Sequence, residues 1–280
     1  MIAEALRAFK HRLRTRRALA EIAGRHIAAP AAHGLGAELI VSLTSYAGRF
    51  PTLVPTLHSL LRQDMRADRT ILWLTEADRA LLPPGIAALT AEGLEIRTTP
   101  DLRSYKKIVP ALLAFPQAFI ATADDDVPYP AHWLSDMVRV AQAHPGCTVA
   151  HRAHRLGWTG EGALTPYESW EKNIDGTVKG PEIFATGVGG VLYPPGILHP
   201  DTTRDDLFMR LCPNADDIWL YWMTRRAGHV ACHVGPKVRV IEWPRSQGGS
   251  LRLTNLGAAG QNGNDRAIAA LTAHYGPPPR

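Results

Sequence analysis

The stretch FIATADDDVPYP, residues 119–130, decides the fold of this chain. An apolar run from Phe119 to Ala123 ends directly at three consecutive aspartates, Asp124, Asp125 and Asp126. Neighbouring carboxylates repel each other, and a buried carboxylate is costly unless a cation pairs with it. The pattern therefore predicts a buried strand with a cation site at its carboxyl end.

Upstream of the aspartates, strand-like runs alternate with helical patterns. We expect strands at 37–46, 69–75, 94–100 and 117–123, and helices over 51–63, 104–115 and 130–144. This alternation predicts an α/β fold with a mostly parallel sheet flanked by helices. Because ligands bind beyond the carboxyl ends of such strands, Thr44, Ser45 and Arg49 are expected at the same edge as the aspartates.

The second half of the chain is less regular. Residues 157–190 are rich in glycine and aromatic residues and are expected to form loops, followed by a short strand before Pro194. The clearest helix of the chain is predicted over 213–228, with Asp216 and Asp217 in its first turn and Gly228 as its stop. We expect strands at 229–234 and 238–243, and a mobile loop over 244–265.

Positive charge is concentrated at the start of the chain. Residues 1–36 hold seven Arg or Lys and two acidic residues, which accounts for the net charge of +5 and leaves 37–280 balanced. A nucleic-acid-binding domain should carry its own basic face, so that class is disfavoured. The three widely spaced cysteines are typical of a reducing compartment, and we expect a cytoplasmic protein.

This basic segment is predicted to be a helix. Ile2, Leu6, Phe9 and Leu13 form one apolar stripe, and cations occupy the other sides. Such a helix over residues 1–25 can lie on an anionic membrane surface or contact a partner; the alternative is a solvated helix packed on its own domain. We therefore divide the chain into a leader, 1–36, and one domain, 37–280, with a donor-binding half over 37–150 and an acceptor half over 151–280.

The aspartate cluster indicates a divalent cation. Carboxylate oxygens favour Mg²⁺ or Mn²⁺ over zinc, and Mg²⁺ completes such a shell with water and phosphate oxygens. On an extended chain, Asp124 and Asp126 would share a ligand while Asp125 faces elsewhere. The alternative is a polar turn after a strand.

Together with VSLTSYAGRFPTLVPTLHSLLRQ (41–63) and YKKIVPAL (105–112), the aspartate stretch resembles bacterial GT-A-fold glycosyltransferases, including those of capsule and surface-polysaccharide synthesis. The resemblance covers about residues 37–270. It implies a GT-A, Rossmann-like domain and a D-x-D element at Asp124, Asp125 and Asp126. It is strengthened by GVGGVLYPP and ADDIWL, which follow in order.

The resemblance also implies roles for individual residues. Asp126 would bind the metal, and Asp124 the metal or the ribose. A nucleotide-sugar donor, most readily a UDP-sugar, would lie against Thr44, Ser45, Arg49, Lys106, Lys107, Asp125, Gly189 and Gly190, with Gly187 nearby. Asp217, or else Asp216, would be the catalytic base; the alternative is that both only stabilise the helix through its dipole, which would also lower the pKa of the carboxylate.

Two further sets of residues carry open alternatives. His233 is a candidate third metal ligand, with His229 second; the alternative is a structural histidine. The lysines could equally belong to a solvated helix face. Four aromatic residues could form an acceptor floor or belong to the core, namely Trp158, Tyr167, Trp170 and Trp243.

The predicted function is a metal-dependent glycosyltransferase that uses Mn²⁺ or Mg²⁺ and transfers a sugar to a glycan or glycolipid acceptor. One alternative is a non-catalytic scaffold of the same fold, held at the inner face of the membrane by its leader. Another is a sugar nucleotidyltransferase, which usually has a glycine-rich loop after its first strand, whereas TSYAGRFP (44–51) contains one glycine.

Overall fold

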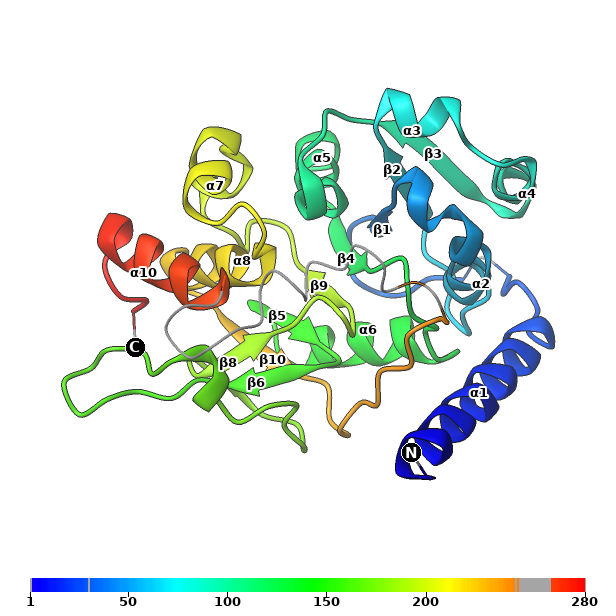
Figure 1. The fold of residues 1–280 in the computed structure, drawn as a ribbon. Coiled ribbons are helices and arrows are strands. Elements are labelled where there is room, and N and C mark those ends of the chain that lie inside the picture. Colours follow the sequence, from blue (N-terminus) through cyan, green and yellow to red (C-terminus); the bar gives the residue numbers. More distant parts are fainter. Residues whose placement is uncertain (1, 30, 245, 247–262, 280) are drawn as a thin grey trace.

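The computed structural model describes residues 2–29, 31–244, 246 and 263–279. Within them, strands and helices alternate as predicted through the first half (Figure 1). The strands are β1 Leu39–Thr44, β2 Arg69–Leu74, β3 Leu94–Thr98, β4 Phe119–Ala123, β5 Cys147–Ala150, β6 Ala153–Arg155, β7 Lys179–Gly180, β8 Ile183–Ala185, β9 Val191–Tyr193 and β10 Val230–His233. The α-helices are α1 Ile2–Ala23, α2 Phe50–Leu61, α3 Glu76–Ala80, α4 Pro84–Ala87, α5 Val109–Ala114, α6 Trp133–Ala143, α7 Asp205–Leu211, α8 Asp216–Arg226 and α10 Gly263–Tyr275.

Eight of these strands form one sheet in the order β3-β2-β1-β4-β9-β5-β10-β7. The pairs among β1, β2, β3 and β4 are parallel, as is the pair of β5 and β10. β9 runs antiparallel to both β4 and β5 and joins the two parallel groups. β6 and β8 pair separately. The prediction of an α/β fold with a mostly parallel sheet is confirmed.

Both faces of the sheet are buried, as the alternation of side chains along β1 shows. Leu39, Val41 and Leu43 face one apolar cluster, and Ile40 faces the other. The first cluster is closed by α2, α4 and α6, and the second by α5, α7, α8 and α10. Helices thus cover both faces, which is the arrangement that a parallel sheet requires.

The leader helix α1 lies at the side of this domain, against α2 (Figure 1). It packs through Thr15 and Ile22, which are 6% and 3% exposed. The predicted stripe faces the other way, since Leu6, Phe9 and Leu13 are 50%, 64% and 39% exposed. α1 therefore packs on its own domain, but not through its apolar stripe. Among the described residues, no helix has the length and hydropathy needed to cross a bilayer.

Three local predictions differ from the structure. Residues 238–243 form no strand, because the sheet is completed beside β10 by β7 instead. The helix predicted over 104–115 is divided into a 3₁₀ turn, Arg103–Lys107, and α5, since Pro110 is tolerated only in the first turn of a helix. Most of the loop predicted over 244–265 lies outside the described residues, and α10 already begins at Gly263.

One glycine next to α6 is required by close packing. Gly190 has φ of +89°, and a Cβ there would lie 2.5 Å from two atoms of the Trp133 ring. The Trp133 indole N–H also donates to the Gly189 carbonyl at 2.8 Å. The turn before β9 is thus packed directly on the buried ring.

Replacing Gly190 with alanine should therefore destabilise the fold. Left-handed backbone costs roughly 1–2 kcal/mol for a residue with a Cβ, and an overpacked core costs about 1–3 kcal/mol more. Gly196→Ala is the matched control, because Gly196 has φ of +72° with no atom within 4 Å of the added Cβ. Urea denaturation should show a clearly larger loss for Gly190→Ala; equal losses would contradict the packing role.

Candidate active site

A large cavity lies at the carboxyl edge of the sheet. Its volume is about 890 Å³, and it is bordered by the ends of β1 and β4, the 3₁₀ turn Arg103–Lys107 and the start of α8. Ten of the predicted site residues line it, namely Thr44, Ser45, Arg49, Lys106, Lys107, Asp124, Asp125, Asp126, Asp216 and Asp217. Residues on separate strands and helices thus meet at one edge, as expected of an α/β sheet.

Arg49 holds two of the three clustered aspartates. Its Nη1 donates to Asp126 Oδ2 at 2.8 Å and lies 3.6 Å from Asp125 Oδ1. Burial alone would lower the pKa of Arg49, but its contacts with Asp126 and Asp125 raise it. The Ser45 hydroxyl donates to Asp125 Oδ2 at 2.6 Å. Even so, burial raises the pKa of Asp125 to about 6.

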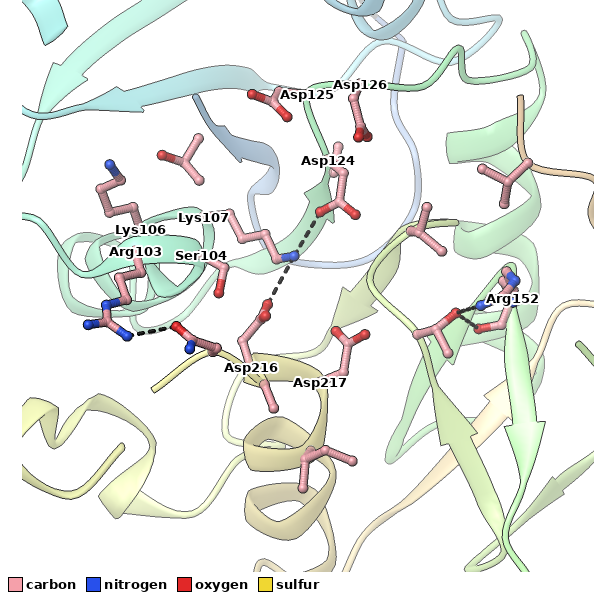
Figure 2. A pocket seen from close by; sticks show the side chains of 18 of the residues that line it. Arg103, Ser104, Lys106, Lys107, Asp124, Asp125, Asp126, Arg152, Asp216 and Asp217 are labelled. Atoms are coloured by element: carbon pink, nitrogen blue, oxygen red, sulfur yellow. Dashed lines mark hydrogen bonds and ion pairs between the residues drawn. The ribbon is translucent and has the colours of Figure 1, made fainter. Parts of the chain in front are cut away.

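This arrangement corrects the predicted directions of the aspartates. Alternation along a strand would pair Asp124 with Asp126, but β4 ends at Ala123 and the chain bends at once. Asp125 and Asp126 therefore share Arg49. Asp124 points instead to Lys107 (Figure 2). All three still line the cavity.

Lys107 lies between the end of β4 and the start of α8. Its Nζ donates to Asp124 Oδ1 at 2.8 Å and lies 3.0 Å from Asp216 Oδ2 (Figure 2). The side chain is 7% exposed, so burial opposes its charge, but the fields of Asp124, Asp216 and Asp217 outweigh burial and raise the pKa of Lys107. The ammonium is therefore the charged centre of this wall, not part of a solvated helix face.

Lys106 occupies a different place from its neighbour. Its Nζ lies 3.5 Å from Asp101 Oδ1, and its side chain is 7% exposed. Thr44, also on the cavity wall, donates its hydroxyl to the Trp73 carbonyl at 2.8 Å. Both residues are at the edge where the donor was expected, but neither contacts the aspartate cluster directly.

Asp217 is held by the backbone of the glycine-rich turn. The Gly187 N–H lies 3.0 Å from both Asp217 carboxylate oxygens. A Cβ on Gly187 would lie 2.8 Å from Asp217 Oδ1 and 2.9 Å from Lys107 Nζ, so a larger residue would displace these side chains from their present positions. Gly189 and Gly190 do not line the cavity, because they pack on Arg152 and Trp133.

The pKa of Asp217 is raised to about 7, whereas the sequence had led us to expect that the helix dipole would lower it. Burial is the largest cause, and the negative charge of Asp216 is the second. Lys107 and the Gly187 N–H act in the opposite direction but are outweighed. The effect of a helix N-terminus is about 0.3–1 kcal/mol, which is less than the cost of burying a carboxylate beside another one.

The structure does not bring the candidate histidines to the cavity. His233 is fully buried in β10, with Nδ1 2.8 Å from the Gly176 carbonyl oxygen and Nε2 3.1 Å from that of His151. His229 has its Nδ1 3.2 Å from the Gly146 carbonyl oxygen. Both contact backbone atoms away from the carboxylates.

Of the four aromatic candidates, only Tyr167 lines the cavity. Trp170 is buried against Phe184, and Trp243 is buried with its indole N–H donating to Thr56 Oγ1 at 2.7 Å. Trp158 lies outside the cavity lining. Trp170 and Trp243 therefore belong to the core and do not form an acceptor floor.

The cavity also contains residues that the sequence did not single out. Arg103 Nη1 donates to Asn214 Oδ1 at 2.7 Å, which links the two halves of the chain across the cavity (Figure 2). On the far wall, Arg152 donates to Thr186 Oγ1 at 3.1 Å, and Lys172 lies 3.2 Å from the centre of the Tyr167 ring. No motif marks these residues, because they meet only through long-range contacts.

The carboxylates suit a hard divalent cation in their chemistry. Five carboxylates line the cavity, and two cations, Lys107 and Arg49, form ion pairs with members of this group, so acidic groups are in excess. The five are Asp124, Asp125, Asp126, Asp216 and Asp217. Within the described ranges, however, no three His, Cys, Asp or Glu side chains are already gathered as a metal-ligating group. The residues present fit such an ion by donor type and by charge.

Comparison with known proteins yields structural neighbours only. No family model and no curated relative matches the chain. Glucosyl-3-phosphoglycerate synthase from Mycobacterium tuberculosis, solved with Mn²⁺, UDP and glucosyl-3-phosphoglycerate, aligns at 15% identity with a TM-score of 0.34, over 42% of this chain and 44% of that chain. 4-Diphosphocytidyl-2C-methyl-D-erythritol synthase aligns at 12% identity with a TM-score of 0.44, over 75% and 94%. The chain thus spans less than half of the mycobacterial enzyme, and at this similarity a function has to come from its own residues.

Lys107→Met should destabilise the protein in a pH-dependent way. Removing one partner of a buried ion pair costs about 3–5 kcal/mol. Burial already raises the pKa of Asp124, and Lys107 opposes that rise. Without the ammonium this pKa rises further in the folded state, so the folded state gains protons as the pH falls. The loss of unfolding free energy should be large at pH 8 and smaller at pH 5.

Lys106→Met is the matched control for this change. Lys106 pairs with Asp101, whose side chain is 70% exposed, so a loss below about 1 kcal/mol is expected. Urea denaturation of both variants at the two pH values checks the prediction. A pH-independent loss in Lys107→Met would mean that the carboxylates do not depend on this lysine.

Proposed function

We propose that this protein is a metal-dependent glycosyltransferase that moves a sugar from a nucleotide-sugar donor to a hydroxyl of a glycan or glycolipid acceptor. The observation that carries the proposal is Asp217, a carboxylate with a pKa of about 7 that is held beside Lys107 and Asp216 on a cavity wall. Strongly perturbed carboxylates in a cavity are typical of acid–base sites. A UDP-sugar is the first donor to test.

The donor diphosphate would lie between Arg49 and Lys107. Both cations are buried and line the cavity, and phosphate oxygens accept charge-assisted hydrogen bonds from such groups. A divalent cation held by Asp124 and Asp126 would act as a Lewis acid on the leaving diphosphate. Lys107, which already contacts Asp124, would donate to the same phosphate oxygens.

Asp217 would act as the general base. As the acceptor oxygen attacks the anomeric carbon of the donor, the O–H bond breaks and the proton passes to Asp217. A new carbon–oxygen bond forms, and the bond from the anomeric carbon to the phosphate oxygen breaks with its electron pair, releasing the nucleoside diphosphate. A base is most effective when its pKa is near the working pH, and a value of about 7 meets that condition.

The two alternative functions lead to different observations. A scaffold has no need for a buried acidic cluster with a raised pKa, which costs folding free energy.

A sugar nucleotidyltransferase joins two phosphate-bearing substrates and releases pyrophosphate, and its nucleophile is a phosphate that is ionised without help from a base. The position of Asp217 favours a hydroxyl acceptor. Release of pyrophosphate from a nucleoside triphosphate and a sugar phosphate would support the nucleotidyltransferase.

Asp217→Asn tests the proposed base. The change keeps the size of the side chain but removes the proton acceptor, and general-base catalysis contributes about 10²–10⁴-fold to a rate. We expect kcat/KM for transfer, or for slow donor hydrolysis with Mn²⁺ or Mg²⁺, to fall by that factor while nucleotide binding persists. In the unchanged protein, kcat/KM should rise as the pH passes about 7, since Asp217 must lose its proton.

Asp205→Asn is the control for this test, because Asp205 is an exposed acid in the first turn of another helix, α7. It should retain full activity. A panel of UDP-, GDP-, CMP- and dTDP-sugars covers the donors. If the protein hydrolyses none of them and no nucleotide shifts its melting temperature, the enzyme proposal is wrong; full activity of Asp217→Asn would exclude only the role given to this residue.

We propose further that α1 makes a peripheral contact with an anionic membrane surface. Its exposed stripe of Leu6, Phe9 and Leu13 is flanked by arginines and a lysine, which is the composition of helices that lie in a membrane interface. The opposite side of α1 is occupied by the domain through Thr15 and Ile22. This geometry leaves the apolar stripe available to the membrane.

Replacing the stripe should remove this contact. The triple variant Leu6→Ser, Phe9→Ser, Leu13→Ser loses the buried apolar area, so its sedimentation with vesicles of phosphatidylglycerol and phosphatidylcholine should fall at least tenfold. The control Leu81→Ser, Leu113→Ser removes two leucines that are each 66% exposed elsewhere on the surface. Equal losses in both variants, or equal binding to vesicles of phosphatidylcholine alone, would contradict the proposal.

A further inference from the structure

A second cavity lies between the leader helix and the segment that follows the aspartates. Its volume is about 520 Å³, and one side of it is formed by α1 and the other by residues 127–133 and 238–241. Its lining includes the apolar side chains of Val127, Pro128, Pro130 and Ile241. It shares Val188 and Val240 with the large cavity, so the two adjoin each other.

The rim of this second cavity is basic. Two arginines of α1, Arg14 and Arg17, line it together with Arg25, which follows the end of that helix. Arg25 is paired with Glu21 and also donates to the Ser59 carbonyl at 3.3 Å. Arg14 and Arg17 have no carboxylate within ion-pair distance among the residues that the structure describes. Two guanidinium groups without an acidic partner thus stand at the entrance of an apolar cavity. A ligand that matches both features carries an anionic head and an apolar chain.

The position of the rim on α1 points to the source of such a ligand. Successive residues of a helix are rotated by about 100°, so Arg17 lies roughly 40° around the helix axis from Leu13. Arg14 lies roughly 60° beyond Arg17 in the same direction, towards the side of α1 that packs on the domain. The cavity entrance therefore lies between the exposed stripe and the body of the protein. A membrane in contact with Leu6, Phe9 and Leu13 would border this entrance.

We propose that the second cavity binds an anionic phospholipid from that membrane. Its phosphate pairs with Arg14 and Arg17, since guanidinium groups bind phosphate through two parallel hydrogen bonds. The first part of its acyl chain lies against Val127, Pro128 and Ile241. Binding of this lipid does not depend on glycosyl transfer. The lipid would lie next to the large cavity and could serve as the acceptor there, and this second step rests on the proposed function.

Binding can be measured with short-chain lipids that stay monomeric in solution. We expect isothermal titration of the full chain to show binding of dihexanoyl phosphatidic acid. Dihexanoyl phosphatidylcholine and inorganic phosphate should each bind at least tenfold more weakly, because each lacks one of the two matching features. If either of these two bound as tightly as phosphatidic acid, the proposal would be overturned. Equal competition by hexaglutamate would overturn it too, because it would indicate a general site for acidic peptides.

Two variants locate the site. Arg14→Ser, Arg17→Ser should lower the affinity for phosphatidic acid at least tenfold, whereas the control Arg12→Ser, Arg16→Ser removes the same charge from exposed positions of the same helix and should change it less than twofold. Ala18→Trp fills the cavity from α1 without a change in charge and should abolish binding. Equal effects of the two arginine pairs, or unchanged binding in Ala18→Trp, would overturn the proposal. None of these measurements needs a donor sugar, so their failure is distinct from failure of the proposed enzyme activity.

Discussion

The ion pairs of Lys107 are the interaction on which the rest of the site depends. One buried ammonium contacts Asp124 at the end of β4 and Asp216 at the start of α8, and it lies close to Asp217. These residues come from opposite halves of the chain, and their carboxylates would repel one another without it. Because one cation compensates three acids only in part, negative charge remains in excess. Burial, together with this excess, raises the pKa values of Asp124 and Asp217, and the excess suits the wall to a cation.

The glycine-rich turn before β9 makes this arrangement sterically possible. Gly187 allows Asp217 and Lys107 to approach its backbone, while Gly189 and Gly190 fit against Arg152 and Trp133. Trp133 is the first residue of α6, which follows the aspartates, so the same packing fixes the turn and the segment after β4. The glycines thus shape the site from behind, although the resemblance had implied direct contact with the donor.

Much of the fold could be predicted because its signals are local. The strands at 39–44, 69–74 and 119–123 are apolar runs bounded by polar residues, and α8 has acidic residues at its start and Gly228 after its end. The predicted strand at 238–243 is wrong because an apolar run can pack at a cavity wall as well as in a sheet, and here Val240 lines both cavities. Only the partners available in three dimensions distinguish the two outcomes.

The sequence by itself determined the α/β fold, the acidic edge of the sheet and the amphipathic leader, because periodicity and residue type act over a few neighbouring residues. Tertiary structure decided which cation pairs with which aspartate, that burial raises the pKa of Asp217 against the helix dipole, and that the apolar stripe of α1 faces outwards. These properties depend on burial and on charges far apart in the chain. No pattern of neighbouring residues encodes those distances.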